Sequence, residues 1–362
     1  MEYPIEISLT KNSRRPGLDL ASLPFGRTFS DHMFTAEYID GKWQNCKIEP
    51  YGPISFAPSM MALHYGQAIF EGMKANLNAK TGEPMLFRTD QHVDRINSSA
   101  DRLGMPEVPA EIYLNAVNAL VAIDKDWIPE DEGSALYIRP FMFATDEWLG
   151  VRASERYKFM VITGPVGPYY TKPVSILVAQ KYVRAFPGGT GYAKAAGNYA
   201  ATIKPATIAK KMGYDQILWL DGLEFKYLQE CGTMNIFAVI GDTVLTPPTS
   251  DSILAGITRS SVIALLKEKG IKVEERPIEI AEIIEAHKAG ELKEMFGTGT
   301  AAVISDVGEL SYQDVTYTLP PVEGRKIGPM VKKLLTDIKT GNAEDTHGWV
   351  EPVRTDMLST VK

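Results

Sequence analysis

The sequence predicts a two-domain protein of mixed α/β and α+β architecture, and three observations support this prediction. The chain has 362 residues, more than a single domain usually contains. Hydrophobic residues make up 44% and charged residues 23%, which is the composition of a globular protein with a large core. Three prolines and two glycines between residues 164 and 173 separate two halves that each contain strand and helix patterns. We therefore expect a smaller N-terminal domain at 1–167, a linker at 168–174 and a larger C-terminal domain at 175–362.

In the N-terminal half, the first 40 residues are expected to be an irregular lead-in, because their proline and polar residues show little periodicity. Apolar residues at helical spacing predict an amphipathic helix over residues 111–123. Runs of β-branched and aromatic residues predict strands at 135–143 and 157–163. From Gly164 onward we expect neither a helix nor a central strand, because proline lacks the amide donor that both require.

In the C-terminal half, apolar runs predict strands at 174–179 and 216–220. A helix is expected over residues 199–212, since a glycine follows directly. Residues 233–246 predict two strands that are joined by a Gly-Asp pair and followed by two prolines. A second helix is predicted over residues 257–269, with basic residues in its last turn and a glycine just beyond its end.

Charge and composition argue against several classes of protein. With 38 basic against 45 acidic residues, the net charge of -7 disfavours nucleic acid or an anionic membrane surface as the main partner. The sequence shows no signal peptide and no run of about 18 apolar residues. Cys46 and Cys231 form no disulfide framework, and neither the cysteines nor the five histidines follow a metal-ligand spacing. We expect a cytoplasmic protein without a bound metal.

A glycine-rich stretch, GGTGYAKAAGNY from Gly188, surrounds Lys194 with small residues. A lysine in such a setting can be desolvated, which lowers its pKa and makes the neutral amine available as a nucleophile or base. The alternative is a surface loop with a solvated lysine. The stretch fits neither a P-loop, since Ala193 and Ala195 flank the lysine, nor a dinucleotide fingerprint. A second stretch, from Gly297, matches the residue pattern of the dinucleotide fingerprint. A predicted strand follows it, however, where the fingerprint requires a helix.

Two further stretches contain charged residues with more than one interpretation. Glu230 begins a strand-like apolar run. It is either an exposed acid at a strand end or a carboxylate that holds a proton on a heterocyclic nitrogen. Arg88, Arg95 and Arg102 recur every seven residues and would share one side of a helix. Such a pattern usually indicates a solvated charged face of a helix. The more specific alternative is an arginine that binds an anion.

Six stretches follow one another in a fixed order, beginning at Leu63 (LHYGQAIFEGMK), Leu136 (LYIRP), Tyr182 (YVRA), Lys194 (KAAGNY), Glu230 (ECGTMN) and Phe296 (FGTGTA). Together they resemble the branched-chain amino acid aminotransferases, which belong to the fold-type IV enzymes that use pyridoxal 5'-phosphate. The resemblance runs from about Phe29 to Lys339 and is strongest to the larger branch of the family, which includes the eukaryotic enzymes. It implies a fold-type IV enzyme with the cofactor at the domain interface, and a homodimer.

The resemblance also implies a role for each matching residue around the cofactor. Lys194 is the covalent anchor of pyridoxal 5'-phosphate and then moves the substrate proton as a general acid/base. Glu230 keeps the pyridine nitrogen protonated, and Tyr199 hydrogen-bonds the phenolic oxygen. The cofactor phosphate meets an arginine fork, a predicted helix N-terminus and a hydroxyl. These remaining cofactor contacts are Arg95, Thr233, Ile257, Thr258 and Thr300.

For the substrates, the resemblance implies an aromatic pocket and two carboxylate sites. Arg139, on the same strand face as Tyr137, is near the second carboxylate of glutamate or 2-oxoglutarate. The amides around Thr300 and Ala301 meet the α-carboxylate. The implied activity is reversible amino transfer between L-leucine, L-isoleucine or L-valine and 2-oxoglutarate. The aromatic residues around the side chain are Tyr65, Phe70, Tyr137 and Tyr169.

Other activities share the core of this pattern, and the chain departs from it in detail. Gln229 and Cys231 flank Glu230 where other residues are more usual, which puts the fine tuning around the cofactor ring in doubt. D-amino-acid aminotransferase and aminodeoxychorismate lyase share the lysine, the glutamate and the arginine. Tyr137 and Arg139, together with the chain length, favour the branched-chain enzyme. An NAD-dependent dehydrogenase would need a strand–GxGxxG–helix unit, which the sequence lacks.

Overall fold

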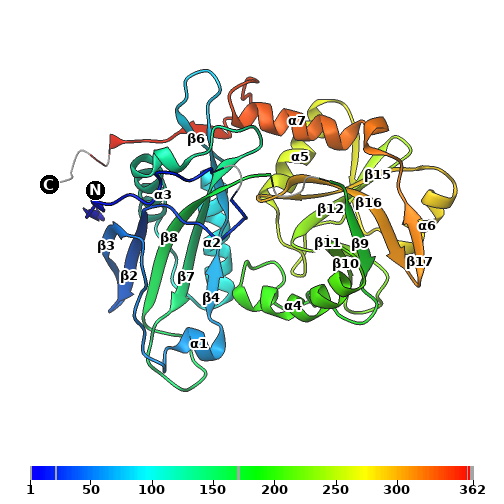
Figure 1. Cartoon of the computed structure of the whole chain (residues 1–362). Coiled ribbons are helices and arrows are strands. Elements are labelled where there is room, and N and C mark those ends of the chain that lie inside the picture. The colour runs from blue at the N-terminus through cyan, green and yellow to red at the C-terminus, as the bar shows by residue number, and fades with distance from the viewer. Residues whose placement is uncertain (1, 21–22, 169–171, 357, 359–362) are drawn as a thin grey trace. The chain divides into compact units, whose positions relative to one another are not determined.

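The computed structural model describes residues 2–20, 23–168, 172–356 and 358, and the chain divides into two compact units (Figure 1). The first comprises residues 1–169, 194–197 and 337–362, and the second comprises residues 170–193 and 198–336. Each unit has its own nine-stranded sheet together with helices. The predicted mixed α/β and α+β class is therefore confirmed. The domain boundaries at 1–167, 168–174 and 175–362 stay a prediction.

The sheet of the first unit is mainly antiparallel. Its strand order is β1-β3-β2-β8-β7-β5-β6-β18, and β4 pairs with β7. The helices are α1 (Met61–Tyr65), α2 (Thr89–Arg102), α3 (Ala110–Ile123) and a short 3-10 helix at Lys125–Trp127. The strands are β1 (Glu6–Ile7), β2 (His32–Ile39), β3 (Lys42–Pro50), β4 (Ala68–Phe70), β5 (Met73–Leu77), β6 (Pro84–Phe87), β7 (Ala135–Ala144), β8 (Tyr157–Val166) and β18 (Val350–Pro352).

Strand β7 shows how this sheet separates its two faces. Leu136, Ile138 and Met142 are fully buried in the core on which α2 and α3 pack. The alternating Tyr137 and Arg139 are half-buried on the opposite face, since successive side chains of a strand point to opposite sides. Two of the predicted substrate residues therefore lie on the face that does not belong to this core.

The prediction of an irregular lead-in over the first 40 residues is wrong for its last part. Residues His32–Ile39 form β2, which pairs with β3 on one side and β8 on the other. The five residues from His32 to Ala36 are all buried. A strand that is covered on both faces lacks the alternation of apolar and polar residues by which a sequence pattern reveals a strand.

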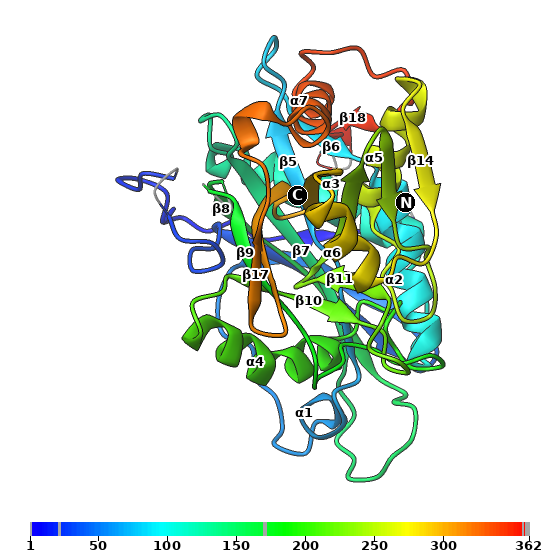
Figure 2. The same ribbon diagram turned by 90° about the vertical axis from the view of Figure 1, so that its right-hand side faces the viewer.

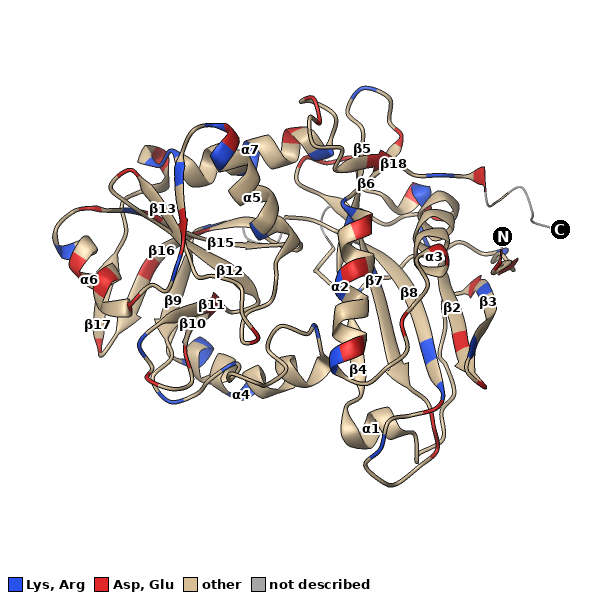
Figure 3. Cartoon of the chain, turned by 180° about the vertical axis from the view of Figure 1, so that it is seen from behind, with Lys and Arg blue, Asp and Glu red and all other residues tan. Residues whose placement is uncertain are grey.

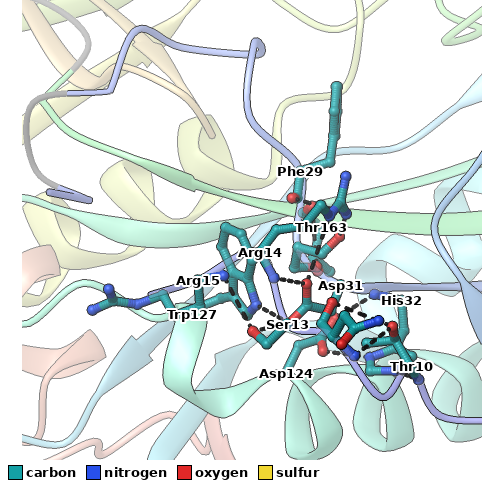
Figure 4. A network of polar contacts seen from close by, with 12 residues as sticks. Thr10, Ser13, Arg14, Arg15, Phe29, Asp31, His32, Asp124, Trp127 and Thr163 are labelled. Atoms are coloured by element: carbon teal, nitrogen blue, oxygen red, sulfur yellow. Dashed lines mark hydrogen bonds and ion pairs between the residues drawn. The ribbon is translucent and has the colours of Figure 1, made fainter. Parts of the chain in front are cut away.

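A buried carboxylate fixes the residues that precede β2 (Figure 4). Asp31 accepts hydrogen bonds from the Arg14 N–H at 2.8 Å, from Trp127 Nε1 at 3.0 Å and from the Ser13 hydroxyl. Because Trp127 lies in the 3-10 helix after α3, Asp31 ties the N-terminal segment to an element about a hundred residues away.

A second buried pair lies beside the first. Asp124 accepts hydrogen bonds from the His32 backbone N–H at 3.0 Å and from its Nδ1 at 2.7 Å. The Thr10 N–H donates to Nε2 of the same imidazole at 2.9 Å, so that Nδ1 carries the proton of a neutral ring. Both ends of the segment before β2 are thus hydrogen-bonded to the body of the first unit (Figure 4).

We expect Asp31→Asn to lower the free energy of unfolding by about 2 kcal/mol at pH 7, because hydrogen bonds to a charged acceptor are lost. Burial raises the pKa of Asp31, but the bonds from Arg14, Ser13 and Trp127 outweigh it and hold that pKa below its usual value. A lowered pKa in the folded state contributes stability above the unfolded pKa, and this is lost as the pH falls through the folded pKa. Urea unfolding at pH 7 and at about pH 3 measures the difference between wild type and variant, which should shrink at the lower pH. Exposed Asp131→Asn is the control. An equal difference at both pH values would contradict the prediction.

Strand β8 continues through the segment where the sequence predicts a break. It spans Tyr157–Val166, and Pro165 pairs with Leu136 of β7. The pairing of β8 with β2 ends at Ile162, so within the described residues the proline lies where β8 has one partner strand. The strand therefore extends beyond the predicted range of 157–163, but only at an edge position where a proline is tolerated, so the expectation of no central strand from Gly164 onward is not contradicted.

Gly164 permits a close approach of the preceding chain to β8. A Cβ on Gly164 would lie 2.3 Å from the carbonyl oxygen of Thr28. We expect Gly164→Ala to lower the free energy of unfolding by about 1–3 kcal/mol, the usual effect of overpacking. Thermal unfolding followed by circular dichroism measures this as a lower melting temperature. Gly324→Ala is the control, since the described structure places no neighbouring atom within 4 Å of its added Cβ. Equal melting temperatures for the two variants would show that the Thr28 backbone yields without cost.

The sheet of the second unit closes on itself. Strand β11 pairs with both β10 and β12, so that β11, β10, β9, β16, β15 and β12 form a ring. Strands β13 and β14 extend the sheet beyond β12, and α5 lies beside β14 (Figure 2). The helices are α4 (Ala196–Lys211), α5 (Ile257–Glu268), α6 (Ile280–Lys288), α7 (Ile327–Lys339) and a 3-10 helix at Val322–Gly324. The strands are β9 (Val174–Val178), β10 (Gln216–Leu220), β11 (Leu228–Cys231), β12 (Met234–Ile240), β13 (Thr243–Thr246), β14 (Lys272–Glu275), β15 (Leu292–Gly299), β16 (Val303–Tyr312) and β17 (Val315–Thr318).

The elements predicted for the C-terminal half are confirmed. The expected helices at 199–212 and 257–269 are α4 and α5, and the strand pair predicted within 233–246 is β12 and β13. The stretch from Gly297 leads into strand β16, as expected, so it is not the start of a dinucleotide-binding helix. Among the described residues, no helix is long and apolar enough to cross a membrane.

Candidate active site

Lys194 lies in the short segment 194–197 that belongs to the first unit, and its main chain is held from two sides. Its N–H donates to the Ser99 hydroxyl at 2.9 Å, and its carbonyl accepts from the Phe70 N–H at 3.0 Å. The next residue, Ala195, forms an antiparallel bridge with Ile69. The Lys194 ammonium lies 4.9 Å from the centre of the Phe70 ring. Helix α2 and strand β4 therefore position this lysine, whose side chain is half-buried.

Arg95, one of the three regularly spaced arginines, takes part in a buried ion pair. Its Nε and Nη2 donate to the two carboxylate oxygens of Glu71 at 2.7 and 2.8 Å. Glu71 is fully buried, and His92 Nδ1 also donates to it at 2.7 Å. Burial raises the pKa of Glu71, but Arg95 and His92 outweigh this and hold it well below its usual value. Glu71 therefore keeps its charge inside the protein.

His92 completes this cluster as a neutral imidazole. Burial lowers its pKa, and the neighbouring Arg95 and Lys194 lower it further against the opposing effect of Glu71. Sequence analysis assigned no role to Glu71 or His92. An acid inside the apolar run Ala68-Ile-Phe-Glu-Gly-Met73 was the signal that could have revealed the first of them.

The other two arginines of the spacing pattern have different surroundings. Arg88 precedes α2 in a left-handed conformation with φ of 51°, and its guanidinium lies 5.2 Å from the Trp349 ring. The prediction that all three arginines share one side of a helix is therefore wrong for Arg88, which lies outside the helix. Arg102 is the last residue of α2, which carries both acidic and basic residues along its length (Figure 3).

Strand β7 brings the predicted substrate residues of the first unit together. Arg139 Nη2 donates to the Tyr137 hydroxyl at 2.9 Å, and its guanidinium lies 4.6 Å from the centre of the Phe70 ring. A cavity of about 170 Å³ adjoins Tyr137 and Arg139. Phe25 and Phe29 also line it, and the Phe25 ring meets Tyr137 edge-on at 5.1 Å. Sequence analysis missed both phenylalanines as site residues because they lie in the aperiodic lead-in.

Of the remaining two tyrosines of the predicted pocket, the structure describes Tyr65 alone. Tyr65 is the last residue of α1, where its side chain is 42% exposed and its ring lies beside His64. Tyr169 lies outside the described residues. The structure therefore describes Phe70, Tyr137 and Arg139 as one cluster.

Glu230 is buried in the second unit, which overturns the alternative of an exposed acid at a strand end. It is 3% exposed in strand β11. One carboxylate oxygen lies 2.6 Å from Arg184 Nε, and the other accepts from the Leu254 N–H at 2.8 Å. Arg184 also donates to the carbonyls of Ser252 and Gly191 at 2.9 and 3.1 Å. Arg184 lies in one of the six stretches that resemble the family, but only the structure reveals its contact with Glu230.

The N-terminus of α5 is positioned from the same strands. Asn235 pairs with Glu230 across β11 and β12, and its Nδ2 donates to the Leu254 carbonyl at 2.9 Å. Leu254 is thus held at its N–H by Glu230 and at its carbonyl by Asn235. Two residues later Gly256 precedes α5, and no side chain among the described residues caps the helix. The uncapped amides at Ile257 and Thr258 are the kind of donors that favour an anion.

Two turns of the second unit lie at one end of its sheet. Thr233 lies in the turn between β11 and β12, and Thr300 and Ala301 lie in the turn between β15 and β16. The Thr233 carbonyl oxygen is 3.8 Å from where a Cβ on Gly299 would lie, so the two turns are neighbours. Thr298, in register with Asn235, has a buried hydroxyl without a hydrogen-bond partner in the described structure. This end of the sheet therefore contains several neighbouring threonines.

Tyr199 lies in the first turns of α4 and is half-buried. The adjacent Asn198 fixes the start of this helix, since its Nδ2 donates to the carbonyls of Thr190 and Ala193 at 2.7 and 2.9 Å. The Thr190 hydroxyl donates in turn to Asn198 Oδ1 at 2.6 Å. The start of α4 beside Tyr199 is thus hydrogen-bonded back to the glycine-rich stretch.

The chain is similar to several known proteins. A model of the amino-transferase class IV family matches residues 68–310. Branched-chain-amino-acid aminotransferase 2 of Bacillus subtilis (strain 168) is 49% identical over 353 residues, which is 96% of this chain and 97% of that protein. A branched-chain aminotransferase of Thermoproteus uzoniensis, solved with norvaline, aligns with a TM-score of 0.74 and 26% identity over 89% of this chain and 100% of that chain. The T.th. branched-chain amino acid aminotransferase, solved with N-(5'-phosphopyridoxyl)-L-glutamate, aligns with a TM-score of 0.69 and 26% identity over 88% and 98% of the two chains.

Proposed function

We propose that this chain, which belongs to the branched-chain-amino-acid aminotransferases of class IV, transfers the amino group between L-leucine, L-isoleucine or L-valine and 2-oxoglutarate. The products are the branched-chain 2-oxo acid and L-glutamate, and the reaction is reversible. It is the last step of biosynthesis or the first step of degradation of these amino acids. The observation that carries the proposal is that the family match at 68–310 includes Arg95, Lys194 and Glu230, each held by its own hydrogen bonds.

The residues present fit pyridoxal 5'-phosphate as the cofactor. An amine, a buried carboxylate and an uncapped helix N-terminus are the groups that a phosphorylated pyridine aldehyde requires, and the structure of the T.th. enzyme contains a phosphopyridoxyl group. When bound, the cofactor supplies an electron-withdrawing ring for the substrate carbanion. Lys194 holds the cofactor covalently and afterwards moves the Cα proton as a base. Glu230 holds a proton on the ring nitrogen, and Arg184 keeps its carboxylate in place.

The remaining cofactor contacts are assigned by resemblance to the family, and their chemistry is consistent with it. Tyr199 hydrogen-bonds the phenolic oxygen. The phosphate dianion is bound by a guanidinium, a helix N-terminus and a hydroxyl, all of which favour negative charge. These phosphate and ring contacts are Arg95, Ile257, Thr258, Thr300 and Thr233.

The substrate side chain is surrounded by aromatic rings in this proposal. Phe70 and Tyr137 offer apolar surface to an aliphatic side chain, and the hydrogen bond between Arg139 and Tyr137 supports this placement. Arg139 binds the second carboxylate when glutamate or 2-oxoglutarate replaces the branched-chain substrate. The amides around Thr300 and Ala301 bind the α-carboxylate. Tyr65 and Tyr169 complete the pocket.

Assembly and location extend the same proposal. We assign the protein to the cytoplasm as a homodimer without a bound metal, nucleic acid or membrane partner. The smaller domain spans residues 1–167, the linker 168–174 and the larger cofactor-binding domain 175–362. Size-exclusion chromatography with light scattering tests the dimer, for which a mass near twice that of one chain is expected.

An absorption spectrum before and after addition of L-leucine tests the activity. The visible band of the bound cofactor should disappear as a near-ultraviolet band of its amino form rises, and 2-oxoglutarate should restore it. A visible band that is indifferent to L-leucine would contradict the substrate assignment and favour a D-amino-acid aminotransferase or a lyase. No cofactor band after reconstitution would contradict the proposal as a whole.

A further inference from the structure

We infer that Glu71 and His92 are positioning residues that hold Arg95 in the orientation required to bind the cofactor phosphate. This inference rests on the proposed function, in which Arg95 binds that phosphate. Neither residue meets the cofactor in the proposal, and both act through the arginine.

The first step is the geometry of the ion pair. Arg95 Nε lies 2.7 Å from one Glu71 oxygen, and Nη2 lies 2.8 Å from the other. Such a two-point contact fixes both the position and the plane of the guanidinium, whereas a single contact would leave it free to rotate. Glu71 uses the edge formed by Nε and Nη2. The N–H groups of Nη1 and the second N–H of Nη2 belong to the other edges, which are the ones able to contact a phosphate.

The second step is the saturation of the Glu71 carboxylate. Besides the two arginine donors it accepts from His92 Nδ1 at 2.7 Å and from the Gly72 N–H at 3.2 Å. Oε2 thus accepts from Arg95, His92 and Gly72, and Oε1 accepts from Arg95 Nε, so the carboxylate cannot turn without losing a bond. A glutamine at this position offers one accepting oxygen and turns its own N–H groups toward the other donors. Glu71→Gln therefore reduces the two-point contact with Arg95 to a single point at most, while the shape of the side chain is kept.

The third step connects the arginine to the lysine. The Ser99 hydroxyl donates to the Arg95 carbonyl at 2.9 Å and accepts from the Lys194 N–H at 2.9 Å. On the other side, Phe70 precedes Glu71 in the chain and donates its N–H to the Lys194 carbonyl. Glu71 and Lys194 are therefore held by the same short strand, and Arg95 and Lys194 by the same helix. A cofactor that binds at two points is held in a reactive orientation when the separation of those two points is fixed.

A different role for Glu71 makes the opposite prediction. If the carboxylate served only as a counter-charge for a buried arginine, its removal would leave the arginine charge for the phosphate alone and would strengthen phosphate binding. If it serves as a positioning group, its removal weakens phosphate binding although the local positive charge increases. The sign of the change therefore distinguishes the two roles.

The experiment compares pyridoxal 5'-phosphate with pyridoxal, which lacks the phosphate, as ligands of the full-length protein freed of cofactor. Dissociation constants come from absorption titrations, and their ratio isolates the phosphate contribution. For Glu71→Gln we expect the preference for the phosphorylated ligand to fall by about tenfold or more, as is typical when a supporting shell is removed. Pyridoxal affinity should stay near that of the wild type. Asp94→Asn, an exposed acid on the same helix, is the matched control and should leave the ratio unchanged.

An unchanged or increased preference for the phosphate in Glu71→Gln would overturn the positioning role. A wild-type protein that binds neither ligand would instead overturn the proposed function, so the two failures are distinguishable. A pair of variants at His92 provides an independent test if Glu71→Gln does not fold. His92→Asn retains an N–H close to the position of Nδ1 and should keep the ratio within a few-fold of wild type. His92→Leu removes the donor and should lower the ratio, and equal ratios for both variants would remove His92 from the positioning group.

Discussion

Lys194→Ala is expected to lower kcat for transamination between L-leucine and 2-oxoglutarate by about 10⁴-fold or more, because one side chain serves as both covalent anchor and general base. The main-chain contacts of Lys194 do not depend on its side chain. The bonds to Ser99 and Phe70 involve the Lys194 main chain, which alanine retains. Steady-state kinetics measures the effect, and the visible absorption band of the covalently held cofactor should be lost in parallel.

The matched control is Lys204→Ala, which removes an exposed lysine on α4 and should leave kcat within about twofold of wild type. Melting temperatures of both variants without cofactor should equal that of the wild type. Lys194→Ala with more than a tenth of wild-type kcat would contradict the assigned role of this lysine. A normal kcat together with a normal visible band would mean that another amine holds the cofactor.

The extent to which sequence predicts the fold depends on how regular each element is. Helix α3 was expected because its apolar residues repeat at helical spacing, and β12 and β13 because a glycine turn separates two β-branched runs. Strand β2 was missed because it is buried on both faces near its start. The end of β8 was missed because the rule against proline in strands holds for central positions, and Pro165 lies beyond the pairing with β2.

The site residues divide in a similar way. Lys194, Glu230 and Arg95 stand in stretches whose composition and order identify them. The residues that hydrogen-bond to them cannot be identified in this way, because they are remote in sequence. Glu71 and Arg95 are 24 residues apart and meet only when β4 and α2 fold together.

The alignment of neighbouring strands is equally difficult to predict from the sequence. Asn235 faces Glu230 on one side and Thr298 on the other only because β12 pairs with both β11 and β15 at fixed alignment. A shift of one residue would turn the side chains to the opposite face. Nothing in the composition of these strands specifies that alignment, which follows from the closure of the ring of strands.

Arg184→Met is expected to lower the free energy of unfolding by about 3–5 kcal/mol, because it leaves the buried Glu230 carboxylate without its charge partner. The two side chains are 6% and 3% exposed, and their atoms lie 2.6 Å apart. Methionine approximates the volume of the arginine stem but donates no hydrogen bond. The carbonyls of Ser252 and Gly191 therefore lose their donors as well. Urea unfolding of the full-length protein without cofactor measures the change.

Removing both charges separates the ion pair from the lost packing. In Arg184→Met with Glu230→Gln, the buried carboxylate is gone, so the double variant should be more stable than Arg184→Met alone although it carries one more substitution. An ion pair at the surface provides the matched control. Arg276 and Glu282 are 38% and 34% exposed, and Arg276→Met should cost less than about 1 kcal/mol. If the double variant is as unstable as Arg184→Met or less stable, the arginine stabilises the protein through its carbonyl contacts. Glu230 would then depend on the Leu254 N–H for its position, and activity should survive in Arg184→Met at temperatures where the variant stays folded.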